Sequence, residues 1–254
     1  MPGDERFPMR GRIYLSDSYL REFEAEVLES EGGACTLTRT AFFPGGGGQP
    51  ADRGELVTAE GPLSVAGVRE DEAGRLWHSV GRNLVPGERV RGVLDWPWRY
   101  ALMRHHGLMH VVNAVARLTF DGVITGVQIG ADRSRIDFRF PEFAREQIPE
   151  FEERVNAAIE RDLRVASAVL LEEEFRARPE LVRTLNAPPP VVDGQVRVVE
   201  MEGFDAQACG GTHVHSTGEI GRARVSKFDN KGKINKRFYW ELEAGRLGSP
   251  GGGE

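Results

Sequence analysis

Apolar and polar residues alternate over short segments through the first ninety residues of the chain. The pattern is seen in CTLTRTAFF, GELVTA, LSVAGVRE, LWHSV and RVRGVLDW, with glycine, proline and acidic turns between them. A two-residue period of β-branched and aromatic side chains is typical of strands that bury one face. Several short strands at close spacing predict a small β-barrel or sandwich. The segment YLREFEAEVLES is ambiguous, because its apolar residues fit a helix or a strand.

After Asp95 the apolar period becomes helical. Leu102, Met109, Val112 and Ala116 recur at this spacing, which predicts a helix from about 97 to 119. GVQIG and RIDFRF predict strands, and PEFAREQIPEFEERVNAAIERDLR predicts a second helix with Pro141 in its first turn. A strand over VASAVLLEEEF, a short helix near RPELVR and strands over QVRVVEME, GRARVSKF and KRFYWELE complete this half. Helices over an antiparallel sheet are expected, an α+β arrangement.

The two patterns together predict a two-domain fold. A small N-terminal β-barrel, with a glycine-rich loop, is expected over residues 1–94, and an α+β domain over 95–247. The last segment, GSPGGGE at 248–254, has the composition of a disordered tail.

The composition is that of a soluble globular protein. The 254 residues suffice for two modest cores, with 40% hydrophobic and 28% charged residues. No apolar run is long enough to span a bilayer, and the charged start MPGDERFPMRGR precedes no apolar segment, so no signal peptide is expected. Cys35 and Cys209 are too few for a disulfide framework, so free thiols and a cytoplasmic location are expected.

Positive charge is concentrated near the C-terminal end. The chain carries a net charge of −6, which argues against a protein that coats nucleic acid. The segment 222–237 nevertheless has a charge of +6, leaving −12 for the rest. Two interpretations stay open, a phosphate-facing patch or a solvated hairpin edge. The basic residues are Arg222, Arg224, Lys227, Lys231, Lys233, Lys236 and Arg237.

The stretch PGGGGQP at residues 44–50 is a glycine run between two prolines. It is not a phosphate-binding loop of the Walker type, because no Lys-Ser or Lys-Thr pair follows it. One interpretation is a flexible turn. The other is a loop where backbone closely approaches a ligand, since no side chain intervenes.

Four histidine and cysteine residues have the spacing of a metal site. His106 and His110 are four apart in the predicted helix, so both imidazoles lie on one face. Cys209 and His213 flank two glycines and a threonine, which allow a loop to fold back on one ion. Three nitrogens and one sulfur suit tetrahedral zinc. The alternative is that the histidines fill a core and Cys209 is a small buried hydrophobe.

Two further histidines lie beside these ligands. His105 is five residues from His110 and points well off its face, so it is excluded as a ligand. His215 competes with His213, because both point to the same side of an extended segment. The spacing alone does not choose between them.

The motifs resemble, in order and over most of the chain, the editing domain of alanyl-tRNA synthetase and its free-standing AlaX relatives. FFPGGGGQPADRGEL resembles the family's glycine-rich motif, and HGLMHVVNAV resembles its first zinc motif. GVQIGADRSRIDFRF resembles the strand pair that follows, and KGKINKR the closing basic hairpin. The most specific signature is CGGTHV followed by TGEIG. No ATP-binding core precedes these motifs, so a free-standing protein is expected rather than a fragment of a synthetase.

The resemblance implies a fold and a reaction. The fold would be a barrel like those of translation factors, followed by the α+β domain shared by alanyl- and threonyl-tRNA synthetases. The reaction would be hydrolysis of the ester that joins serine, or sometimes glycine, to tRNA for alanine. One zinc ion would be held by His106, His110, Cys209 and His213, and the tRNA would contact the basic segment 222–237. Two alternatives are a zinc-stabilised RNA-binding module without catalysis and a deacylase for another mischarged tRNA.

Substrate contacts are expected from residues at the family's motif positions. They are Gln49, Gln128, Thr212 and the backbone of Gly210 and Gly211. The alternative is that Gln128 is a satisfied sheet residue and that residues 210–212 only shape the ligand loop. Arg135 and Asp137 are expected to be a structural ion pair or residues of the sheet face, and not catalytic residues.

The chain departs from the family after the first zinc histidine. A threonine is usual there, often followed by alanine, and Gly107 and Leu108 replace them. The resemblance places position 107 in the amino-acid pocket, so the missing hydroxyl bears on how serine is distinguished from alanine.

Overall fold

The computed structural model describes residues 11–183 and 189–243. Three antiparallel sheets, one of seven strands and two of four, form most of the fold together with a few helices. The tail predicted at 248–254 lies outside the described residues. Within them, no helix is both long and apolar enough to cross a membrane.

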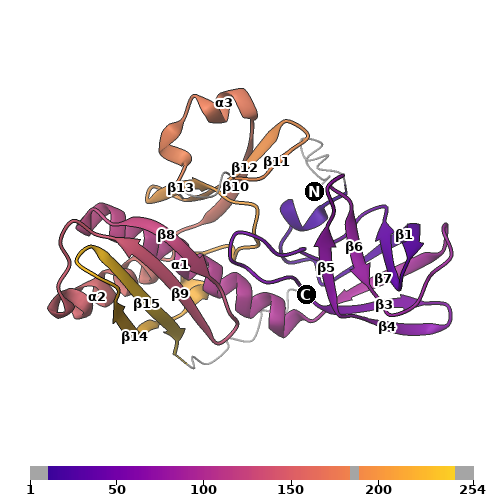
Figure 1. The fold of residues 1–254 in the computed structure, drawn as a ribbon, viewed down its shortest axis with the longest axis horizontal. Coiled ribbons are helices and arrows are strands. Elements are labelled where there is room, and N and C mark those ends of the chain that lie inside the picture. Colours follow the sequence, from indigo (N-terminus) through magenta and orange to yellow (C-terminus); the bar gives the residue numbers. More distant parts are fainter. Residues whose placement is uncertain (1–10, 184–188, 244–254) are drawn as a thin grey trace, which may run out of the picture.

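The predicted strands of the N-terminal half pair into a single sheet, which curls at the indigo and purple end of the ribbon in Figure 1. The strand order is β4-β3-β7-β1-β2-β6-β5. The strands are β1 (Glu22–Glu31), β2 (Ala34–Leu37), β3 (Gly54–Thr58), β4 (Gly61–Val65), β5 (Gly67–Glu70), β6 (Leu76–Ser79) and β7 (Arg89–Leu94). Among the described residues no ladder joins the edge strands β4 and β5. The expected barrel is therefore observed as a curled sheet.

Strand β1 resolves the ambiguous segment. Phe23, Ala25 and Val27 are buried and alternate with exposed glutamates, because successive side chains of a strand point to opposite faces. The buried face joins a hydrophobic core of the N-terminal half that includes Phe42 and Leu56. The helical interpretation of this segment is excluded.

Helix α1 (Trp96–Phe120) confirms the predicted long helix. Asp95 caps its start, where the carboxylate accepts a hydrogen bond from the Trp98 N–H at 3.2 Å, and Pro97 occupies the first turn. The helix ends at Asp121, which adopts a left-handed conformation with φ 51°. In Figure 1, α1 runs from the N-terminal sheet into the C-terminal half. Most of its residues between Leu102 and Ala116 are buried.

The C-terminal half contains the two smaller sheets. One has the order β14-β15-β9-β8, and in the other β10, β11 and β13 all pair with β12. Their strands are β8 (Val123–Gln128), β9 (Arg133–Arg139), β10 (Val165–Leu171), β11 (Val191–Val192), β12 (Gln195–Met201), β13 (Asp205–Ala208), β14 (Ala223–Asn230) and β15 (Asn235–Leu242). The segment predicted as one strand over VASAVLLEEEF ends at Leu171, and α3 (Glu172–Arg176) follows.

Helix α2 (Ile148–Glu160) begins seven residues later than the sequence indicated. Pro149, and not Pro141, lies in its first turn. Phe143, which lies between the two prolines, explains the later start of the helix. Its ring stacks on Phe140 at 4.7 Å between centroids and contacts Phe151 at 6.0 Å. This packing into the aromatic core holds residues 141–144 out of the helix.

The two halves have separate hydrophobic cores. The C-terminal core gathers α1, α2 and the sheet strands around Phe138, Phe151 and Trp240. Strand β7 ends at Leu94 and α1 begins at Trp96. The division into domains at residues 94 and 95 stays a prediction, and α1 is the element that reaches both halves.

Candidate metal centre

The four predicted metal ligands meet where α1 passes the loop after β13. Their ligand atoms all lie within 4.8 Å of one another. His106 and His110 come from successive turns of α1, and Cys209 and His213 come from the loop. Three of the side chains are buried and Cys209 is half-buried. The spacing argument thus selected residues that the fold brings together across about a hundred positions of sequence.

The distances within the cluster fit a tetrahedral ion. Cys209 Sγ lies 3.4 Å from His106 Nε2 and 3.7 Å from His213 Nε2. His213 Nε2 lies 3.2 Å from His110 Nε2. A zinc ion with ordinary bond lengths and tetrahedral angles separates two nitrogens by about 3.3 Å and a nitrogen from sulfur by about 3.6 Å. The donor set therefore fits zinc in type and spacing.

The protonation states of the cluster suit a metal. Desolvation by burial lowers the pKa of His106 and His213 well below the usual range and that of His110 to about 3, so the imidazoles are neutral near pH 7. Burial raises the pKa of the Cys209 thiol, while the Gly211 peptide N–H and the Arg197 guanidinium oppose that rise. A bound cation would displace the thiol proton.

The structure decides between the neighbouring histidines. His213 is the one in the cluster, and its Nδ1–H donates to the Gly211 carbonyl at 3.1 Å. His215 is exposed and stacks on Tyr19 with 3.9 Å between ring centroids. His105 is buried, and its Nδ1 lies 3.0 Å from Ser134 Oγ. His105 and His215 thus both lie outside the cluster.

A cavity of about 640 Å³ lies beside the cluster. Three of the four ligands line it, and Gly210 and Gly211 form the adjoining wall. Residues from both halves complete it, including glycines 45–48 of the N-terminal half and Val127 and Ile129 at the end of β8. A substrate in this cavity would lie against the metal ligands and against the two glycines of the ligand loop.

The other predicted substrate residues do not line the cavity. Gln128 is exposed, because its neighbours Val127 and Ile129 face the cavity and strand side chains alternate. Thr212 is fully buried, and its hydroxyl accepts a hydrogen bond from Gln49 Nε2 at 2.9 Å. Gln49 is buried behind the ligands, with its Oε1 2.7 Å from His106 Nδ1. Gln49 therefore lies directly against a predicted ligand, whereas Thr212 contacts Gln49 and reaches no ligand through its hydroxyl.

Position 107 also faces away from the cavity. A Cβ added to Gly107 would lie 3.3 Å from Val214 and Ile220. Gly107 is not among the residues that line the cavity. Residue 107 turns about 100° around the helix from His106, so its place in an amino-acid pocket stays a prediction that this cavity does not support. The missing threonine hydroxyl does not change the cavity wall.

The basic segment is largely neutralised by nearby carboxylates. Arg222 pairs with Glu160 and Glu243, Arg224 with Glu241, Lys227 and Lys231 with Asp229, and Arg237 with Asp137. Arg237 makes two hydrogen bonds to Asp137, at 2.7 and 2.9 Å, whereas Arg135 Nε lies 3.8 Å from that carboxylate. The structural pair predicted for Asp137 thus forms mainly with Arg237. A local charge counted from sequence overstates the positive field of this hairpin.

Two lysines of the hairpin differ in role. Lys236 is buried, and its ammonium donates to Asn230 Oδ1 and to the carbonyls of Gly232 and Lys233. It therefore holds the turn between β14 and β15. Lys233 is exposed and pairs with no carboxylate in the described part of the chain. Of these two, Lys233 is the one that a phosphate can reach.

Arg197 is a site residue that the sequence analysis missed. Its guanidinium donates to the carbonyls of Cys209 at 3.0 Å and Gly211 at 2.9 Å, while its own carbonyl accepts from the Cys209 N–H at 3.0 Å. It is buried, and it lines the cavity. Three hydrogen bonds therefore hold the ligand loop against β12. The available signal was a basic residue between valines in the strand QVRVVEME.

Asn113 is a second cavity residue that the sequence analysis missed, although its spacing from the histidines could have identified it. It lies seven residues after His106 and three after His110, on the same face of α1. Asn113 lines the cavity, and its Nδ2 donates to Gln207 Oε1 at 3.4 Å. The amide is thus the polar group that follows the ligands along the helix.

Comparisons with known proteins agree with the motifs. The model of the threonyl and alanyl tRNA synthetase second additional domain matches residues 196–239. The chain is 37% identical to the alanyl-tRNA editing protein AlaX-M of Saccharolobus solfataricus, over 92% of this chain and all of that protein. It is 35% identical to AlaX-L of Pyrococcus horikoshii, over 91% of this chain and 57% of that protein. It is also 39% identical to the alanine–tRNA ligase of Korarchaeum cryptofilum, over 87% of this chain and 25% of that protein.

Proposed function

Because the chain belongs to the AlaX family of alanyl-tRNA editing proteins, we propose that it is a trans-editing hydrolase. Its substrate is tRNA for alanine that carries serine, or glycine, in place of alanine. The binding free energies of two similar amino acids in a hydrophobic pocket differ by only about 1–3 kcal/mol. A second site is therefore needed to remove the errors. The reaction cleaves the ester between the amino acid and the tRNA, and water supplies the hydroxyl.

The observation that carries this proposal is the position of the four-ligand cluster in the wall of a cavity. One zinc ion would be held by His106, His110, Cys209 and His213, whose donor atoms have tetrahedral spacing. Such an ion supplies a Lewis acid for an ester carbonyl or a bound water. Burial keeps the imidazoles neutral, and Arg197 fixes the loop that carries the thiol.

The cavity supplies the remaining contacts. Its volume of about 640 Å³ lies within the range of small-molecule sites, roughly 300–1,000 Å³, and leaves room for an amino acid with the terminal nucleoside. Gly210 and Gly211 present peptide groups to the ester without an intervening side chain. Asn113 offers an amide for the hydroxyl or amine of the wrong amino acid.

The experiment is a hydrolysis panel. Purified protein is incubated with tRNA for alanine charged with serine, glycine or alanine, and with tRNAs for threonine and for proline that each carry a wrong amino acid. We expect rapid loss of the seryl ester, or of the glycyl ester, with the alanyl ester spared. Binding of these tRNAs without any hydrolysis by folded, zinc-loaded protein would instead identify an RNA-binding module. Preferential hydrolysis on the mischarged tRNA for threonine or for proline would identify a different deacylase.

A further inference from the structure

The glycine-rich loop folds into a tight hairpin that delivers one side chain to the metal centre. Gly46 and Gln49 exchange backbone hydrogen bonds of 2.9 and 3.0 Å around Gly47 and Gly48, whose φ angles are 57° and 87°. Positive φ at both central positions is the requirement of a type I′ turn, which glycine meets without strain. The Gly48 carbonyl accepts from the Ile129 N–H at 2.8 Å. The glycine run is thus an ordered hairpin docked on the end of β8.

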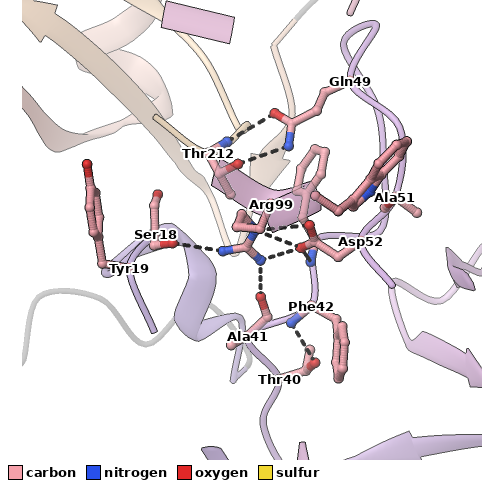
Figure 2. Close-up of polar contacts among 12 residues, drawn as sticks. Ser18, Tyr19, Thr40, Ala41, Phe42, Gln49, Ala51, Asp52, Arg99 and Thr212 are labelled. Carbon is pink, nitrogen blue, oxygen red and sulfur yellow. Dashed lines mark hydrogen bonds and ion pairs between the residues drawn. The ribbon is translucent and has the colours of Figure 1, made fainter. Parts of the chain in front are cut away.

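The Gln49 amide that this hairpin presents has only one consistent orientation. The Thr212 backbone N–H, which can only donate, lies 3.2 Å from Gln49 Oε1. The other end of the amide donates from Nε2 to Thr212 Oγ1 at 2.9 Å. Figure 2 shows these two bonds side by side. Because that N–H needs an acceptor, the atom at the Oε1 position is the amide oxygen.

This orientation determines which nitrogen of His106 carries the proton. Gln49 Oε1 lies 2.7 Å from His106 Nδ1, and an amide oxygen can only accept. His106 Nδ1 is therefore the protonated nitrogen, and Nε2 keeps its lone pair. Nε2 is the atom that faces Cys209 Sγ at 3.4 Å. Ligating histidines are commonly oriented by such a partner on the other ring nitrogen.

We propose that Gln49 is a positioning residue of the metal centre, by which the N-terminal half fixes His106 in its ligating tautomer. The inference rests on the proposed zinc-dependent function and assigns Gln49 no contact with substrate. The Gly211 backbone packs directly against this contact, since a Cβ on Gly211 would lie 2.5 Å from His106 Nδ1 and 2.8 Å from Gln49 Oε1.

A buried ion pair anchors the chain just after Gln49. Asp52 binds the Arg99 guanidinium of α1 through both carboxylate oxygens, with Nε contacts of 2.9 and 3.0 Å. Arg99 also donates to the carbonyls of Ser18 and Ala41, and the whole group is drawn in Figure 2. Arg99 lies two turns of helix before His106, so the contact fixes the hairpin to the same helix that carries the ligand.

The test compares Gln49→Met, Gln49→Glu and Thr212→Val in the full chain. Met matches the size of Gln but accepts no hydrogen bond from His106, whereas Glu keeps the acceptor. Thr212→Val is the matched control, because it removes the Gln49 Nε2 bond and leaves the His106 contact in place. Zinc affinity is measured by competition with a chelator, and the His106 tautomer by ¹⁵N NMR of the zinc-free protein.

We expect the wild-type His106 to be protonated at Nδ1. Gln49→Met should weaken zinc binding about 10- to 100-fold and lose the single tautomer, while Gln49→Glu and Thr212→Val stay within a few-fold of wild type. A proton on Nε2 in the wild type would overturn the inference without any variant. Equal losses in Gln49→Met and Thr212→Val would also overturn it, because they indicate packing alone. No readout uses deacylation, so failure here is distinguishable from failure of the proposed function.

Discussion

At the scale of single residues, close approach explains the composition of the ligand loop. Gly211 adjoins the ring of His106, and a Cβ there would lie 2.2 Å from His106 Cε1. Only a hydrogen fits in that space, so CGGTH requires glycine at this position for packing as well as for flexibility. The ligand set itself was predictable from sequence, because residues four apart in a helix lie on the same face whatever the tertiary structure. The role of Gln49 was not, since its contact with His106 joins residues 57 apart.

Gly211→Ala should therefore disrupt the metal centre. The added methyl group forces His106 or Gln49 to move, and overpacking of this kind costs about 1–3 kcal/mol. We expect at least a tenfold loss of zinc affinity, measured by chelator competition, and a lower thermal midpoint. Gly67→Ala is the matched control, because a Cβ at Gly67 meets nothing within 4 Å. Equal zinc affinity in the two variants would contradict this packing.

At the scale of elements, the period of the apolar residues made α1 and most strands predictable. The start of α2 was not, because Phe143 is drawn into the aromatic core and local pattern does not report such packing. The β14–β15 hairpin shows the same limit for charge. Its strands were predicted, but the carboxylates that neutralise it come partly from β9 and α2. The net charge of residues 222–237 therefore overstates the positive charge at the surface of the hairpin.

Charge reversal at Lys233 should weaken tRNA binding several-fold at low salt and leave zinc content unchanged. Loss of one phosphate contact lowers the salt slope of binding by about one. Lys236→Glu is a different experiment, because the buried ammonium holds the turn and its reversal should destabilise the fold. Arg89→Glu on the N-terminal sheet controls for general charge, since Arg89 is largely exposed. An affinity and salt slope for Lys233→Glu equal to those of wild type would refute the patch.

Strand β6 carries a buried histidine that makes stability depend on pH. His78 Nδ1 lies 3.2 Å from the Cys35 carbonyl and Nε2 lies 2.8 Å from Thr40 Oγ1, and burial lowers its pKa to about 4. The unfolded histidine titrates near pH 6.5. Between these values only the unfolded chain binds the proton, so the free energy of unfolding falls as pH falls through this window.

The effect of His78 is measured by urea unfolding at pH 7 and pH 5. Between these two values wild type should lose about 2 kcal/mol more than His78→Gln, because the variant lacks this titrating group. Other groups contribute equally to both proteins, so the difference isolates His78. The same pH dependence of the unfolding free energy in both proteins would show that burial does not lower the pKa of His78.

At the scale of the whole molecule, the two halves meet through buried polar contacts beside the metal centre. Arg99 is fully buried and joins α1 to Asp52, Ser18 and Ala41. The two separate cores were predictable from the change of hydrophobic period near Asp95. Their junction was not, because an arginine on a helix is usually exposed and only the tertiary structure shows its partners. The curled sheet was likewise not predictable, because it depends on pairing between strands that are distant in sequence, such as β1 with β7.

Breaking the Arg99 pair should therefore affect stability and metal binding together. Arg99→Met leaves the Asp52 carboxylate buried without its partner, which costs about 3–5 kcal/mol. We expect this loss in urea unfolding, with a parallel fall in zinc affinity as the Gln49 hairpin loosens. The control is Arg91→Met, whose exposed pair with Glu22 contributes less than about 1 kcal/mol. Similar unfolding free energies for the two variants would contradict the assigned junction.

The central claim, that a zinc ion on these four ligands supports deacylation, is tested by reloading the metal. Zinc is removed from the folded protein and returned in steps while the initial rate of seryl-ester hydrolysis on tRNA for alanine is followed. The account predicts a rate that rises with zinc and saturates at one equivalent per chain, with no rise in Cys209→Ala. Full activity in the zinc-free protein, or none at one bound equivalent, would contradict it.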